Sequence, residues 1–491
     1  MKLKGKYIFL SLFIILLVSC NSNRVTRDKA QASFKDNDYE TAISYLKAEN
    51  IDNNLIDLNL DEAMLLFLNG QYKESSTLFN STGYQMAMYT GEMTVGQMIQ
   101  AGLISEESIT YVGPAYEYAL IDIMNAYNYI MMDDLDNARA MMRRSFNNNK
   151  SAFNELKAKL REIEIQSEKA FNSSQTQNAI RDMADEGLYY DFNSFVNTTL
   201  DNEDTEYGLS PFVFFLGSAL FANNREYELS YDWMRNIKPF ISKGLASSVI
   251  DIPQGMGSID VVTLSDTIVK REEAVKYIPM LIDMYGLSVT FKLTWPVVSE
   301  SFNIVKNIRV KVRKQYIDMD DNIKVGPVVD SCFGELIEDF DSGVRLDVAS
   351  KAEGAFARSL IRNITRKTAT YLASILAVQT AWDSAEDGTM AQYLAYLAAV
   401  TATQTAMAAL DATECADTRQ CVFFPSKAHA AGFILEPGLY TVEVEYMNKS
   451  GRVIKTDMIH NVEVNEGLPT VVPSEYINTG NLQLDIDDYY Y

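Results

Sequence analysis

The sequence predicts an α+β protein, in which an N-terminal domain of repeated α-helices precedes a mixed domain of antiparallel β-strands with an Ala-rich helical hairpin. Three observations predict this class. A spacing of small and large residues recurs through the first half, segments that alternate apolar and polar residues begin after residue 245, and two alanine-rich stretches separate the strand groups. The 491 residues, of which 47% are apolar, are enough for two or three hydrophobic cores.

The N-terminal segment has the features of a lipoprotein signal peptide. Three lysines in the first six residues precede an apolar run over residues 7–18, which is shorter than the ~20 residues that span a bilayer. The ending Leu-Val-Ser-Cys at residues 17–20 resembles the lipobox of bacterial lipoproteins. That resemblance implies removal of residues 1–19 and acylation of Cys20, with palmitate among the expected chains. Because Asn21 follows, we expect an outer-membrane lipoprotein of the cell envelope that faces the periplasm.

The charge of the chain bears on its partners. Removal of residues 1–19 takes away three lysines and no acids, which moves the formal net charge from −23 to −26. Such a surface repels nucleic acid. We therefore expect a membrane contact through the N-terminal lipid and an envelope protein as partner, and no nucleic acid.

The helical half, residues 20–244, contains a recurrent pattern. A small residue is followed after nine positions by an aromatic residue or Leu, and after three more by another small residue. These residues resemble the tetratricopeptide repeat (TPR), in which small residues let two antiparallel helices touch and the large residue fills the turn; the alternative is a generic helical bundle. The pattern occurs at Ala30, Tyr39 and Ala42, at Ala63, Tyr72 and Ser75, at Ala126, Leu135 and Ala138, and at Ser218, Tyr227 and Ser230.

The C-terminal half, residues 245–491, is predicted to be the mixed domain. Residues 287–298 and 307–316 alternate as strands do, and residues 433–448 return through Lys449-Ser450-Gly451 into 452–464 as a hairpin. Alanine-rich stretches at 352–383 and 390–411 predict two helices. Their threonines and glutamines, and the shortness of the apolar part of the first, favour a hairpin packed through alanine in water or against a partner over membrane spans.

Three segments, residues 113–144, 356–373 and 416–438, together resemble an uncharacterised family of TPR-containing bacterial lipoproteins. The resemblance implies helical repeats, then a helix with spaced basic residues, then an Ala-Asp-x-Arg segment that leads into a strand. Its most specific piece is Ala416-Asp417-Thr418-Arg419, with Pro425 behind it. Cys421 stands where the family has an aromatic residue, and Gly432 where it has an arginine. Family members are thought to accompany lipoproteins that activate cell-wall synthases, which implies envelope or cell-wall assembly.

The cysteines other than Cys20 suggest a small disulfide loop. Cys415 and Cys421 are close in sequence, and in an oxidising compartment we expect them to pair. Two alternatives stay open: both are thiols, or Cys332 pairs with one of them. Since the chain has 2 histidines, a zinc site is disfavoured.

The sequence offers no catalytic constellation. General acid–base chemistry most often uses histidine, and no phosphate-binding glycine loop or complete calcium loop is present. We expect no enzyme, no cofactor and no metal. The expected function is a lipid-anchored scaffold or adaptor that binds a protein through its TPR-like repeats. The alternative is a solute- or glycan-binding outer-membrane lipoprotein.

Overall fold

The structure is a computed structural model. It describes residues 25–52, 55–92, 111, 113–147, 210–282, 288–300, 303–317, 323–349 and 390–477, together with single positions between 350 and 389. The predicted signal peptide, the lipidated Cys20 and most of the predicted helix at 352–383 lie outside the described residues.

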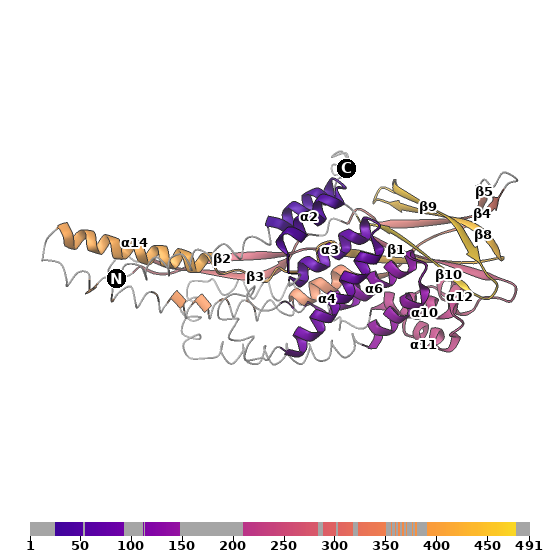
Figure 1. Ribbon diagram of the computed structural model, residues 1–491, viewed down its shortest axis with the longest axis horizontal. Coiled ribbons are helices and arrows are strands. Elements are labelled where there is room, and N and C mark those ends of the chain that lie inside the picture. Colours follow the sequence, from indigo (N-terminus) through magenta and orange to yellow (C-terminus); the bar gives the residue numbers. More distant parts are fainter. Residues whose placement is uncertain are drawn as a thin grey trace.

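Helices come first along the chain and strands dominate after residue 256, which confirms the predicted α+β class (Figure 1). Residues 25–35, 135–147 and 340–349 are also helical. The labelled helices are α2 (Tyr39–Glu49), α3 (Ile56–Leu68), α4 (Tyr72–Glu92), α6 (Ala115–Met131), α10 (Pro211–Asn223), α11 (Tyr227–Ile237), α12 (Lys243–Ile250) and α14 (Met390–Ala412). The strands are β1 (Gly257–Thr267), β2 (Arg271–Ile282), β3 (Ser288–Val298), β4 (Asn307–Ile317), β5 (Ile323–Phe333), β6 (Glu335–Asp339), β7 (Pro425–Leu435), β8 (Gly438–Met447), β9 (Val453–Val464) and β10 (Pro469–Tyr476).

The strands form two four-stranded sheets and a separate two-stranded ribbon. One sheet has the order β10-β1-β7-β6, in which β1 and β10 are parallel and the other pairs antiparallel. The second has the antiparallel order β5-β4-β8-β9. The predicted hairpin is present as β8 and β9, and Gly451 in its turn has a left-handed φ of 80°.

The first sheet lies between two hydrophobic cores. Along β1, Ile259 and Val261 belong to the core shared with β4 and β8, whereas Val262 and Leu264 belong to the core shared with the helices. This alternation follows from the two-residue period of a strand. The molecule therefore has three layers, with helices, first sheet and second sheet in that order.

The helical repeats share one turn geometry. Four non-helical residues with left-handed φ, namely Asn37, Gly70, Asp133 and Arg225, end the first helix of each predicted pair. At Gly70, for example, its N–H donates to the Phe67 carbonyl and the next N–H, of Gln71, donates to the Leu66 carbonyl. The same two bonds recur at the other three turns, which is the Schellman termination of a helix. Each turn stands two residues before the large residue of the sequence pattern.

The small residues of the pattern lie between paired helices. All eight are buried, and the Ser75 hydroxyl donates to the Ala63 carbonyl at 2.8 Å while Ser218 donates to the Ser230 carbonyl at 2.7 Å. Of the large residues, Tyr72 packs at its turn, with its ring centroid 5.6 Å from that of Phe67, whereas Tyr227 is 52% exposed. The eight buried small residues are Ala30, Ala42, Ala63, Ser75, Ala126, Ala138, Ser218 and Ser230. Three of the large residues are partly buried against the same core, namely Tyr39, Tyr72 and Leu135.

The connection between the two halves differs from a simple boundary. Helix α12 runs across residues 244 and 245, where the sequence places the start of the mixed domain, and it packs on β1 and β7. Strand β1 was not predicted, because Ser258, Asp260 and other polar residues interrupt its apolar pattern although all of them are buried. The helical layer and the first sheet consequently share one core.

An arm projects from the body. It consists of the β2–β3 ribbon and, beyond it, helix α14, which forms one end of the elongated molecule (Figure 1). Helix α14 confirms the second of the two predicted alanine-rich helices. Within the described residues, its segment Gln392–Ala412 is the one helix long and apolar enough to cross a membrane. Of the most apolar 18 residues of this segment, 11% are buried.

The repeat packing can be tested in α2. We expect Ala42→Leu to lower the free energy of unfolding by about 1–3 kcal/mol, because the larger side chain has to displace the neighbouring helix. Ala48→Leu on the exposed side of the same helix is the control and should leave it unchanged. Chemical denaturation of both variants measures the difference, and equal stabilities would show that Ala42 does not lie at a tight helix contact.

Candidate functional site

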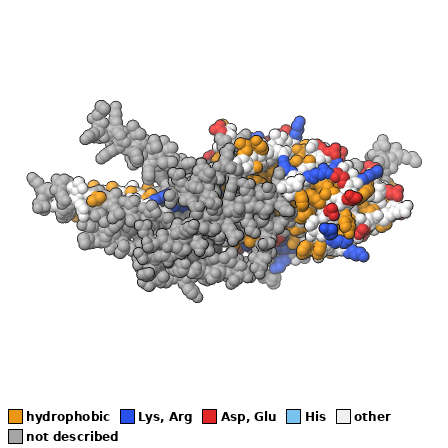
Figure 2. Space-filling model, turned by 90° about the horizontal axis from the view of Figure 1, so that it is seen from below, with side chains coloured by type: hydrophobic (Ala, Val, Ile, Leu, Met, Phe, Trp, Pro, Cys, Tyr) orange, Lys and Arg blue, Asp and Glu red, His pale blue; other side chains and the backbone are white. Residues whose placement is uncertain are grey.

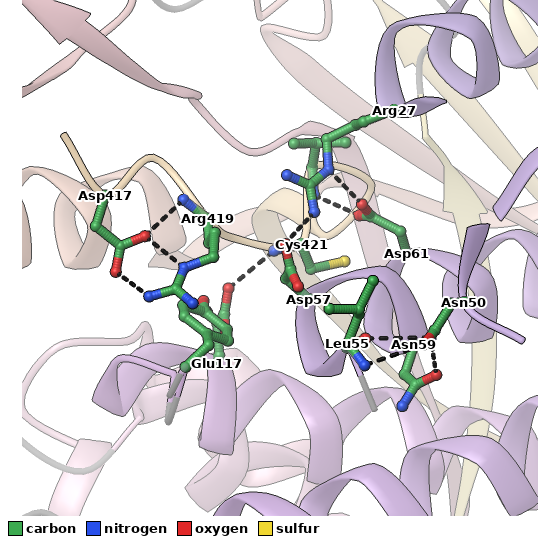
Figure 3. A network of polar contacts seen from close by, with 12 residues as sticks. Arg27, Asn50, Leu55, Asp57, Asn59, Asp61, Glu117, Asp417, Arg419 and Cys421 are labelled. Atoms are coloured by element: carbon green, nitrogen blue, oxygen red, sulfur yellow. Dashed lines mark hydrogen bonds and ion pairs between the residues drawn. The ribbon is translucent and has the colours of Figure 1, made fainter. Parts of the chain in front are cut away.

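The candidate site is a groove of the helical repeats that a segment of the same chain fills. Residues 416–424, here called the docking segment, connect α14 to β7 and lie against α3, α6 and the helix at 25–35 (Figure 3). The Cys421 N–H donates to Glu117 Oε1 at 2.9 Å, and the Val422 N–H donates to Asp61 Oδ1 at 2.7 Å. Two helices thus hold the segment by its main chain.

Asp61 also binds the first described helix. Its Oδ2 accepts from Arg27 Nε at 2.7 Å, and Arg27 Nη2 donates to Asp57 Oδ2 at 2.8 Å. Burial opposes the positive charge of Arg27, but Asp61 and Asp57 outweigh it and raise the pKa of the guanidinium. Asp61 therefore links three parts of the chain that are distant in sequence: the N-terminal helix, the repeats and the docking segment.

Glu117, in the first turn of α6, binds the neighbouring residue of the docking segment. Its side chain is fully buried, and its Oε2 accepts from the Tyr111 hydroxyl at 2.7 Å. Burial raises the pKa of Glu117 to about 7, although the hydrogen bond from Tyr111 acts in the opposite direction. The carboxyl group holds the docking segment in either protonation state, because both states can accept the Cys421 N–H.

Aromatic contacts complete the groove. The Phe423 ring lies 4.8 Å from that of Phe34, between centroids, and the Phe424 ring stacks on Phe79 at 6.3 Å with an interplanar angle of 11°. Both docking-segment rings are buried. Such pairs add about 0.5–1.5 kcal/mol each to the stabilisation that comes from buried apolar area. The groove thus binds the main chain through carboxylates and the side chains through apolar pockets.

The other end of the docking segment is the Ala-Asp-x-Arg motif. Arg419 Nε and Nη2 both lie 2.8 Å from the Asp417 carboxylate, and the Arg419 N–H also bonds that group. The guanidinium carbon lies 5.2 Å from the centroid of the Tyr111 ring. Ala416 N–H donates to Glu273 on β2 at 2.8 Å. The motif forms a local turn whose contacts join the groove to the base of the arm.

The prediction of a Cys415–Cys421 disulfide is wrong. Cys332, Cys415 and Cys421 are all thiols in this structure. The reason lies in their surroundings: Cys421 is held in the groove by the bond of its N–H to Glu117, whereas the Cys415 thiol contacts the Thr413 carbonyl at 3.8 Å. Burial raises the pKa of the Cys421 thiol well above its usual value, which makes it a poor nucleophile.

Gly432 lies where the structure has no room for a side chain. A Cβ atom there would overlap the Ser248 hydroxyl oxygen and would lie 3.1 Å from Asp260 Oδ1. Asp260 accepts from the Ser248 hydroxyl at 2.5 Å and the Ser258 hydroxyl at 3.3 Å. Burial raises the pKa of Asp260 to about 7. The two serines thus bond the buried carboxyl group.

The charged residues of the groove were missed in the sequence. Their signal is the presence of Asp57 and Asp61, one helical turn apart, in α3, a helix that is otherwise mostly apolar and buried on all sides. Glu117 likewise precedes an apolar run in α6. Isolated acids in such helices indicate partners that are themselves buried, but the sequence does not show which segment supplies those partners.

The chemistry of the groove is binding chemistry. His429 lies in β7, and burial lowers its pKa to about 4, so its imidazole is uncharged at neutral pH. Among the described residues, no group of three or more His, Cys, Asp or Glu side chains could hold a metal ion. The carboxylates of the groove bind main-chain N–H groups and arginine. This arrangement holds a segment that bends at residues 420 and 422–424.

Comparisons with known proteins add little to this geometry. No protein-family model and no curated protein matches the chain. One solved structure, the "TPR2AB-domain:pHSP90-complex of yeast Sti1", matches with 11% identity over 46% of this chain and 81% of that chain, at a TM-score of 0.19. At that score the likeness carries no weight, and the repeat geometry stands on the turns and buried small residues described above.

The raised pKa of Glu117 predicts a pH dependence. Because the pKa of the folded state exceeds that of the unfolded chain, the contribution of Glu117 to stability is fully present below pH 4.5 and is lost as the pH rises through 7. Between pH 5 and pH 8 we expect the free energy of unfolding to fall less in Glu117→Gln than in the wild type, with a difference of up to about 3 kcal/mol. Denaturation at both pH values measures this. Glu74→Gln, on an exposed position of α4, is the control, and parallel profiles for all three proteins would contradict the assignment.

Proposed function

We propose that this chain is a lipid-anchored scaffold or adaptor of the bacterial cell envelope, without catalytic activity, that binds a protein partner through its TPR-like repeats. The observation that carries the proposal is the filled groove. There the repeats hold a bent segment of the same chain by two main-chain bonds and two aromatic contacts. Helical repeats that hold a polypeptide segment in this way are suited to binding proteins.

The occupied groove also constrains where a partner binds. Cys421, Val422, Phe423 and Phe424 are buried in the groove, so an external peptide would have to displace them. We therefore assign the partner to the outward faces of the repeats. They carry large exposed side chains, among them Tyr84 at 68%, Tyr227 at 52% and Tyr231 at 49% exposure. Tyrosine is enriched in protein interfaces.

The anchor and the body are joined by a short connection. The chain from Cys20 to Val25, where the first described helix begins, can extend at most roughly 18 Å. Two residues later Arg27 is fixed by Asp57 and Asp61. If Cys20 is acylated, the body is held close to the membrane surface. This supports a scaffold that acts at the outer membrane, in envelope or cell-wall assembly.

Site-specific crosslinking tests the proposal. A photo-reactive phenylalanine analogue is placed at Tyr84 on α4, and in a matched variant at Val329 on β5, which is 51% exposed. Both variants are expressed as the lipidated full chain, irradiated in cells and recovered from detergent-solubilised envelope. We expect one discrete crosslinked protein from the Tyr84 variant and none from the Val329 variant.

Three outcomes would contradict it. The first is that neither variant captures a protein and none co-purifies in stoichiometric amount. The second is that both variants capture the same mixture. The third is that the melting temperature rises with an added sugar while no protein is captured, which would favour a glycan-binding lipoprotein.

A further inference from the structure

Helix α14 has an uncharged surface of defined length. Residues 390–410 contain no Asp, Glu, Lys or Arg, and as an α-helix they are about 30 Å long. The hydrocarbon layer of a bilayer has the same thickness, about 30 Å. The next charged residues in the sequence are Asp387 on one side and Asp411 on the other. Charges therefore bound the uncharged stretch at both ends, as they do where a helix leaves a bilayer.

Apolar side chains of the first two turns of α14 are exposed, whereas Met407 nearer the base is buried. Met390, Tyr393, Leu394 and Leu397, which share one face at helical spacing, are 72%, 55%, 57% and 39% exposed. Figure 2 shows hydrophobic and uncharged groups toward the outer end of the arm. The exposed part of the helix is thus not a core element of the body. An exposed apolar face of this size marks an interaction surface.

The threonines of α14 do not oppose an apolar environment. The hydroxyls of Thr401, Thr403 and Thr405 donate to carbonyls four residues earlier, at 2.8, 2.9 and 2.8 Å. Hydroxyls bonded within their own helix need no water. The threonine content, which favoured a water-exposed hairpin in the sequence, is therefore compatible with hydrocarbon.

The charged groups gather at the base of the arm. Arg362 Nη2 lies 2.6 Å from the Glu414 carboxylate, and Lys367 pairs with Asp411. Lys292 on the ribbon donates to the Glu414 carbonyl at 2.6 Å. These bonds fix the inner end of α14 to the β2–β3 ribbon.

We propose that α14 inserts into the hydrocarbon layer of the membrane to which the N-terminal lipid holds the chain. The proposal rests on the lipid anchor of the proposed function. The match of the uncharged length to the bilayer favours lipid as the occupant. A second copy is disfavoured, because two chains with a formal charge of −26 each repel one another. The arm would give the scaffold a second attachment and fix its orientation on the membrane.

Depth-dependent fluorescence quenching tests the insertion. In the full lipidated chain, the partly exposed Cys332 is replaced by Ser, while Cys415 and Cys421 stay as buried thiols. An added cysteine with an environment-sensitive dye is placed at Leu397, or at Val329 as the exposed control, and the chain without the added cysteine gives the background labelling. The protein is reconstituted into vesicles of phosphatidylethanolamine and phosphatidylglycerol that contain lipids with a spin label on the acyl chain. We expect loss of most of the emission at 397 and no loss at 329. Leu394→Asp together with the label at 397 should restore the emission.

The outcomes separate the arm from the anchor. Palmitate labelling and flotation with the vesicles report the anchor; if Cys20→Ser retains the label, or the wild type does not float, the anchor is wrong. If the wild type is labelled and floats but the dye at 397 is not quenched, the insertion is wrong. If the emission of the dye at 397 shifts to the blue as protein concentration rises, and does so without lipid, a second copy of the chain covers the helix.

Discussion

The structure depends on the capture of two main-chain N–H groups by two buried carboxylates. Asp61 and Glu117 stand on different helices and bond consecutive residues of the docking segment, Cys421 and Val422. A buried carboxylate is costly unless it is bonded, so neither helix presents a stable inner surface without the segment. The repeats and the sheet-rich half are for this reason parts of one folding unit and not two independent modules.

The bonds from Asp61 and Glu117 to the docking segment also position the N-terminal helix, the arm and the first sheet. Through Asp61 and Arg27 they fix the helix that follows the predicted lipid anchor, and through Asp417, Arg419 and the neighbouring Ala416 they reach the base of the arm. Strand β7, which continues the docking segment, then forms the centre of the first sheet with β1. Anchor, repeats, sheet and arm are connected through a few residues. Such connections suit the proposed scaffold function, in which the position of the chain on a membrane is transmitted to a partner.

The sequence predicted the features that local patterns encode. The repeat turns at Tyr39 and Tyr72, the β8–β9 hairpin and helix α14 follow from spacing, turn residues and composition. Strand β1 could not be predicted, because Asp260 and its serine partners are buried there and break the apolar alternation. The Cys415–Cys421 bridge was predicted from the spacing of the two cysteines alone. What fixes Cys421 is a hydrogen bond to Glu117, which is 304 positions away in the sequence. Such long-range pairs leave no mark in a single sequence.

Hydrogen exchange of the docking segment tests the central claim most directly. If Asp61 and Glu117 hold the segment, the amides of Cys421 and Val422 will exchange only on global unfolding, at the same rate as the amides in the core of β1. The double variant Asp61→Asn, Glu117→Gln will exchange these two amides faster. The peptide that covers residues 416–424 should report this in the intact chain by mass spectrometry. Fast exchange of these amides in the wild type, while β1 stays protected, would show that the segment is a loosely attached loop and would contradict the account.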